Sequence, residues 1–191
     1  MRRAALTPIA LVLGASLALA GCATDGGSEP SPSASTSTDE ATSEPTAAAT
    51  LSADVPADQL PTASGSFGEK PVLTFPETPA PADLQVKILH QGTGSLVEAG
   101  DDLEVNYLGQ SWGGHVFDNS YDRGSSISFP IGVGAVIGGW DEGLVGQAIG
   151  SRVLLSIPSH LGYGDRGVPQ AGIKGGDTLV FVVDIIDSRG A

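Results

Sequence analysis

The chain has 191 residues, a formal net charge of −13 and a single cysteine. This acidic balance excludes proteins that bind nucleic acid through a basic surface, and one cysteine excludes a disulfide within the chain. All tryptophan, tyrosine and phenylalanine residues lie from Phe67 onward, where seven bases face fifteen acids, a net charge of −8. The part that can form a core is therefore also unsuited to direct binding of anionic lipid head groups.

The first 21 residues predict a signal peptide. Arg2 and Arg3 precede an apolar run that is too short and too rich in small residues for a membrane-spanning helix. The run ends in LAGC, Leu19 to Cys22, which resembles the lipobox of bacterial lipoproteins. This resemblance implies cleavage before Cys22, a lipid on its thiol, and attachment to the extracytoplasmic face of the bacterial cell membrane. The alternative is an ordinary secretory signal with a chance cysteine.

Residues 22–66 predict a disordered, acidic tether that is rich in Ser, Thr, Pro and Ala. Residues 23–66 hold seven acids and no Lys, Arg or aromatic residue, so they bury too little apolar surface to offset the entropy of ordering. A flexible chain of this length reaches roughly 35–40 Å. Residues 67–80 predict an extended, proline-rich lead-in, and the sequence leaves open whether it packs as an edge strand or continues the tether.

Residues 81–191 predict one α+β domain. Five segments have the alternating or β-branched pattern of strands, the last of them central: residues 84–90, 102–109, 126–131, 152–158 and 177–187. Residues 138–150 break this pattern and predict a short helix, with Trp140, Leu144 and Ala148 on one face. The expected fold is a single antiparallel β-sheet of about five to six strands, half-wrapped around one short α-helix.

Motifs for metal, nucleotide and hydrolytic chemistry are incomplete. Asp118 begins a possible calcium loop, but Arg123 and Phe129 stand where that loop needs Gly and Glu. The glycine-rich residues 132–139 and 167–174 lack, respectively, the third glycine and the lysine of nucleotide-binding loops. The three histidines have no ligand spacing, and no nucleophile has a paired base. The sequence therefore predicts no metal and no cofactor, and favours a function that uses an apolar pocket.

The aromatic residues allow two interpretations. In a small domain they form the core. Tyr163 lies in a glycine-flanked loop, where a buried core residue is not expected, and Trp140 begins a short helix beside glycines. From the residues alone, an aromatic pocket and a plain core are equally supported.

Five motifs then follow one another in sequence order: VNYLG (Val105–Gly109), VFDNS (Val116–Ser120), FPIGVGAVIGGWDEGLVGQAIGSR (Phe129–Arg152), IPSHLGYG (Ile157–Gly164) and DTLVFVVDII (Asp177–Ile186). Together they resemble the FKBP-type peptidyl-prolyl cis-trans isomerases, from about residue 84 to 187. The resemblance implies the half-wrapped sheet expected above. It also implies isomerisation of Xaa-Pro bonds, with proline-containing polypeptides as substrates and macrolides as inhibitors.

The same resemblance assigns the site. It puts Trp140 at the pocket floor, the backbone N–H of Ile137 as donor to a ligand carbonyl, and the Tyr163 hydroxyl at the rim. Arg123 resembles the family's basic partner of Asp118. The remaining pocket residues that the resemblance implies are Tyr107, Phe117, Phe129, Val136 and Phe181.

Two departures from the family leave specificity open. Ile127 replaces an aromatic wall residue, and the loop between Tyr163 and Thr178 is about one residue longer, so a role for Ile173 stays open. The expected function is a monomeric, exported, membrane-anchored isomerase that assists the folding of extracytoplasmic proteins. The alternative is a proline-binding or holdase module with little turnover.

Overall fold

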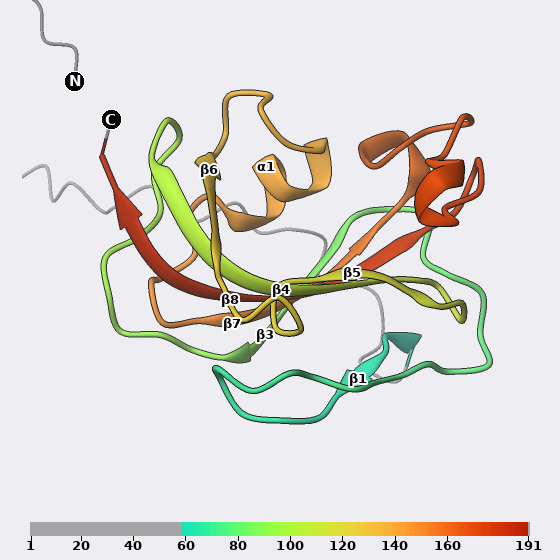
Figure 1. Cartoon of the computed structure of the whole chain (residues 1–191), viewed down its shortest axis with the longest axis horizontal. Coiled ribbons are helices and arrows are strands. Elements are labelled where there is room, and N and C mark those ends of the chain that lie inside the picture. Colours follow the sequence, from blue (N-terminus) through green and yellow to red (C-terminus); the bar gives the residue numbers. More distant parts are fainter. Residues whose placement is uncertain (1–58, 191) are drawn as a thin grey trace, which may run out of the picture. The chain divides into compact units, whose positions relative to one another are not determined.

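The computed structural model describes residues 59–190 (Figure 1). Its six-stranded antiparallel sheet consists of β3 (Gln85–His90), β4 (Asp102–Ser111), β5 (Val116–Asn119), β6 (Ile127–Pro130), β7 (Arg152–Ile157) and β8 (Leu179–Arg189). The strands lie in the order β3-β7-β8-β4-β5, and β6 also pairs with β4. The predicted signal peptide, Cys22 and most of the predicted tether lie outside the described residues.

The α+β fold expected from the sequence is confirmed. The five segments predicted as strands correspond to β3, β4, β6, β7 and β8, and β8 is central because it lies between β7 and β4. The sequence did not predict β5, because its four residues include the polar Asp118 and Asn119 and show no clear alternation.

One short helix, α1 (Gly138–Leu144), packs on the inner side of the curved sheet (Figure 1). Its side chains Trp140 and Leu144 are buried in the main core. Gly139 lies so close to β7 that a Cβ there would come within 2.4 Å of the Ile157 side chain. Ala148 lies beyond the end of the helix, so the predicted helical face is shorter than expected.

The other side of the sheet is covered by residues 59–75, which we call the strap (Figure 1). In the strap, β1 (Thr62–Ala63) pairs with β2 (Leu73–Thr74). Ala63, Leu73 and Phe75 pack on a second apolar cluster of Leu154, Val180 and Val182. The central strands are therefore buried on both faces, which explains why their apolar residues run on without alternation.

The strap corrects the predicted domain boundaries. A tether that extends through residue 66 is wrong at its C-terminal end, because Leu60 and Pro61 are already buried and β1 follows. The lead-in that the sequence left open packs on the sheet. The rings of Phe75 and Trp112 are 5.5 Å apart, and Trp112 Nε1 donates to the Thr78 carbonyl at 3.3 Å.

A buried ion pair holds the strap to the sheet. Arg152 Nε and Asp184 Oδ1 are 2.5 Å apart, and their side chains are 2% and 0% exposed. Arg152 donates to the carbonyls of Gly65 at 2.8 Å and Glu69 at 2.7 Å, and the N–H of Gly68 donates to Asp184 at 2.7 Å. A buried ion pair needs further hydrogen bonds to offset its lost hydration, and here the strap backbone supplies them.

Candidate active site

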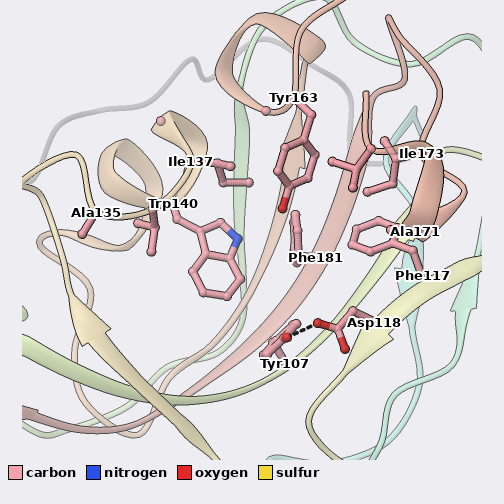
Figure 2. Close-up of a pocket in the computed structure, with 14 residues that line it drawn as sticks. Tyr107, Phe117, Asp118, Ala135, Ile137, Trp140, Tyr163, Ala171, Ile173 and Phe181 are labelled. Carbon is pink, nitrogen blue, oxygen red and sulfur yellow. Dashed lines mark hydrogen bonds between the residues drawn. The ribbon is translucent and has the colours of Figure 1, made fainter. Parts of the chain in front are cut away.

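A cavity of about 690 Å³ opens between the inner face of the sheet, α1 and the loops after β7 (Figure 2). Strands β4, β5 and β8 form one side of it, and α1 with the segment before it forms another. The lining residues are Tyr107, Phe117, Asp118, Ala135, Val136, Ile137, Gly138, Trp140, Gly162, Tyr163, Val168, Ala171, Ile173 and Phe181.

Aromatic rings in edge-to-face contact form the floor of the cavity. The Trp140 ring lies 5.4 Å from that of Tyr107 and 5.2 Å from that of Phe181, at interplanar angles of 79° and 81°. Phe117 meets Phe181 at 5.6 Å and 79°. Such pairs are favoured by the ring quadrupoles and fix one another's orientation. The buried Trp140 indole N–H has no partner among the described residues.

Two predicted wall residues do not line the cavity. Phe129 and Ile127 lie on β6, opposite Leu103 and Val105 of β4, and both pack against the main core. The Phe129 ring lies 5.1 Å from that of Trp140. Phe129 therefore supports the floor from behind instead of forming a wall.

The polar rim is a closed arrangement of three side chains. The Tyr107 hydroxyl donates to one oxygen of Asp118, and Arg123 donates to the other. Arg123 also donates to the Tyr107 oxygen at 3.0 Å, and its guanidinium carbon lies 5.5 Å from the centre of the Tyr107 ring. Both Asp118 oxygens thus have partners, which favours a structural charge over a free base or a metal ligand.

The electrostatics agree with this arrangement. Burial acts to raise the pKa of Asp118, but the hydrogen bonds from Tyr107 and Arg123 outweigh it and hold that pKa below its ordinary value. Burial raises the pKa of Tyr107, as does its bond to Asp118. Near neutral pH, Asp118 is therefore ionised and Tyr107 is a protonated donor.

Tyr163 supplies a second hydroxyl at the mouth of the cavity. Its hydroxyl points into the cavity (Figure 2), and the residue is 40% exposed. Burial of the ring, with the nearby charge of Asp118, raises its pKa, so the hydroxyl stays protonated. It can donate a hydrogen bond to a ligand carbonyl.

The segment that enters α1 presents a backbone donor. Ile137 is the N-cap residue of α1, and its N–H makes no hydrogen bond with the residues that the structure describes. Asp141, in the first turn, accepts from the N–H groups of Gly132 and Gly134, both at 2.7 Å. Asp141 therefore fixes the loop that delivers Val136 and Ile137 to the cavity.

Across residues 59–190, no group of three or more His, Cys, Asp or Glu side chains could hold a metal ion. No helix in the same range has the length and apolar character needed to cross a membrane.

Comparison with known proteins identifies the family. The family described as FKBP-type peptidyl-prolyl cis-trans isomerase matches residues 94–186. The FK506-binding protein of Streptomyces anulatus is 44% identical over 119 residues, which cover 62% of this chain and 96% of that protein. The chain belongs to the FKBP-type peptidyl-prolyl cis-trans isomerase family.

Other FKBP proteins support this assignment. The probable FK506-binding protein of Corynebacterium glutamicum is 38% identical over 121 residues, 63% of this chain and 99% of that protein. Among solved structures, FkpA from Escherichia coli has a TM-score of 0.53 and 41% identity, covering 57% of this chain and 49% of that chain. AtFKBP13 has a TM-score of 0.51 and 36% identity, covering 56% and 94%. The isomerase activity predicted from the motifs is confirmed, and the family implies proline-containing substrates and macrolide binding.

Several lining residues of this FKBP were not predicted: Ala135, Gly138, Gly162, Val168 and Ala171. Val168 and Ala171 belong to the longer loop after β7, which also contains the short 3-10 helices η2 (Ser159–Leu161) and η3 (Pro169–Ala171). Ile173, whose role the sequence left open, pairs with Val168 and lines the cavity beside them. The sequence does carry one indication that this loop lines a cavity, because Val168, Ala171 and Ile173 are apolar residues in an otherwise polar, glycine-rich segment.

Proposed function

We propose that this isomerase binds the prolyl ring of an Xaa-Pro segment against Trp140 and promotes rotation about the preceding peptide bond. The observation that carries the proposal is the aromatic cavity itself. It combines an apolar floor with one backbone N–H, at Ile137, that has no partner among the described residues.

The physical basis is differential binding of the twisted transition state. Rotation of a peptide bond faces a barrier of ~18–20 kcal/mol, because resonance is lost. The planar amide is more polar than the twisted one, so a dry aromatic cavity disfavours the ground state more than the transition state. Lowering the barrier by ~7 kcal/mol accelerates the reaction roughly 10⁵-fold. No covalent intermediate or proton transfer is needed.

The polar groups have orienting roles in this proposal. The Ile137 N–H and the Tyr163 hydroxyl donate to substrate carbonyls on either side of the ring. At the rim, Arg123 balances the charge of Asp118, and Tyr107 bonds to both side chains. These groups therefore hold a fixed electrostatic field beside the rotating bond, and neither oxygen of the Asp118 carboxylate is left without a partner. Preorganised dipoles of this kind need no reorganisation during the reaction.

A protease-coupled assay on a short Xaa-Pro peptide tests the site. Trp140→Leu is expected to lower kcat/KM by roughly 10- to 100-fold, since it removes the floor. Trp112→Leu is the matched control, because Trp112 packs on the strap, away from the cavity. Equal activity of the two variants would refute the site. Aggregation suppression without any acceleration by the wild type would favour the holdase alternative.

We further propose that the isomerase is exported and anchored through a lipid on Cys22, with the acidic segment as tether. The LAGC sequence after an apolar run and the absence of any other cysteine support this proposal. Two acyl chains hold a protein at a membrane where one is marginal. Cys22→Ser is expected to release the protein from the membrane fraction, and retention of the variant there would rule the anchor out.

We also propose that the folded part is monomeric, because residues of a single chain supply the whole lining of the aromatic cavity. Light scattering of the protein without its N-terminal signal would detect a dimer.

A further inference from the structure

The rim arginine depends on a loop that is exposed to solvent. Arg123 lies in residues 119–124, the rim loop, which begins at the last residue of β5 and leads toward β6. Asp122, Arg123 and Gly124 are exposed, and the loop's internal bonds include Asp122 N–H to Asn119 Oδ1 at 2.8 Å. Such a loop alone gives a long arginine side chain little fixed orientation.

From this loop, Tyr121 extends to the back of the sheet. Its hydroxyl donates to Asp184 Oδ2 at 2.9 Å and lies 3.3 Å from Arg152 Nη2. Burial raises the pKa of Tyr121, with the Asp184 charge as the second cause, so the hydroxyl remains a donor. The rim loop is thus bonded to the same buried ion pair that holds the strap.

The strap also contacts the rim loop directly. Lys70 Nζ donates to both oxygens of Asp122, at 2.7 and 2.6 Å. The Asn119 side chain donates to the same carboxylate at 3.0 Å, which ties the contact to the end of β5. Tyr121, Asp122 and Arg123 are consecutive in the sequence, so a contact that holds Tyr121 or Asp122 also limits the position of the Arg123 backbone. The loop is therefore held at two adjacent residues: at Asp122 by Lys70 of the strap, and at Tyr121 by the buried ion pair of β7 and β8.

We propose that Lys70 and Tyr121 are positioning residues for the isomerase site, which hold the rim loop from the back of the sheet so that Arg123 meets Asp118 and Tyr107. The inference rests on the proposed role of that rim. It gives the strap, which covers the opposite face of the sheet, a role in the reaction.

A double-mutant cycle with Arg123 tests this coupling, because residues that act through a common group are non-additive. Lys70→Met and Tyr121→Phe are each expected to lower kcat/KM about two- to fivefold, the range of exposed pairs and single hydrogen bonds. In an Arg123→Met background, neither change is expected to lower kcat/KM further. Lys70→Arg is expected to restore activity, and Lys87→Met, on β3 at the far edge of the sheet, is the control.

Additive losses in the Arg123→Met background would overturn the proposal, as would wild-type kcat/KM in both single variants. Thermal unfolding separates a positioning effect from simple destabilisation. A loss of stability lowers the unfolding temperature in both the wild-type and the Arg123→Met background, whereas a positioning effect lowers kcat/KM only in the wild-type background. A second measurement needs no turnover. The Asp118 carboxyl, titrated by NMR, is expected to show a raised pKa in Lys70→Met, and an unchanged pKa would contradict the inference even if the wild type lacked isomerase activity.

Discussion

The two faces of the sheet differ in how their polar groups are paired. The inner face carries the aromatic cavity, where the Trp140 indole N–H and the Ile137 backbone N–H have no partners among the described residues. The back face carries an ion pair, and there Arg152 and Asp184 are surrounded by hydrogen bonds from the strap and Tyr121. A buried donor without a partner is unfavourable, so the Trp140 N–H, together with the N–H of the half-buried Ile137, suits the inner face to a ligand that accepts hydrogen bonds. On the back face, the bonded ion pair holds the strap and the rim loop in fixed positions.

The largest expected effect follows from disturbing the back face. Asp184→Asn leaves the Arg152 guanidinium buried without its counter-charge, and breaking one side of a buried pair lowers the free energy of unfolding by about 3–5 kcal/mol. Urea unfolding measures this loss.

The paired replacement Arg152→Met with Asp184→Leu is the informative companion. It removes both charges, so it is expected to destabilise less than Asp184→Asn alone. A loss of under about 1 kcal/mol for Asp184→Asn would show that the back face is not held by the ion pair.

On the inner face, a change that loosens the loop before α1 is expected to have an intermediate effect, on substrate binding. Asp141→Asn weakens two charge-assisted hydrogen bonds to backbone N–H groups, each of which contributes about 1.5–3 kcal/mol. The Ile137 donor then loses its fixed position, and KM for an Xaa-Pro peptide is expected to rise about tenfold with a smaller change in kcat. The neighbouring Glu142→Gln removes an equal charge from an exposed side chain, and should leave KM unchanged. Equal shifts in both variants would point to net charge instead.

The smallest expected effect is a pH dependence at the rim. Because the folded-state pKa of Asp118 is below its ordinary value, its contribution to stability is present above that ordinary value and is lost as pH falls through the folded-state pKa. The side chains of Arg123 and Asp118 are 42% and 45% exposed, so the contribution is below about 1 kcal/mol. The stability difference between wild type and Asp118→Asn should be constant near neutral pH and shrink below about pH 4. A difference that grows in acid would reverse the assigned direction.

The sequence predicted those parts of the fold that carry a periodic apolar pattern. Strands β3, β4, β6, β7 and β8 were found in this way, and so was α1. The strap was assigned in part to the tether and in part left open, because β1 and β2 have only two residues each and show no apolar period, and because backbone groups make its bonds to Arg152 and Asp184. Any residue type supplies such bonds, so composition does not record them.

The candidate site was predicted less completely, and the misses have a geometric cause. The family resemblance implies that Phe129, and Ile127 in place of an aromatic residue, are pocket walls, but the pairing of β6 with β4 places both against the core. That register cannot be read from the motif. Val168 and Ala171 reach the cavity because their loop folds back through the pairing of Val168 with Ile173, a short bridge that no apolar period marks in the sequence.

The strap also decides where an independently folding fragment can begin. The family match starts at residue 94, and a fragment cut there would lack β1, β2 and β3. Its outer surface would present Leu154, Val180 and Val182 to water next to two uncovered charges, together with β7 as an unpaired edge that invites association with other chains. A fragment expressed for crystallisation should therefore start no later than residue 59, well before the residues that match the family.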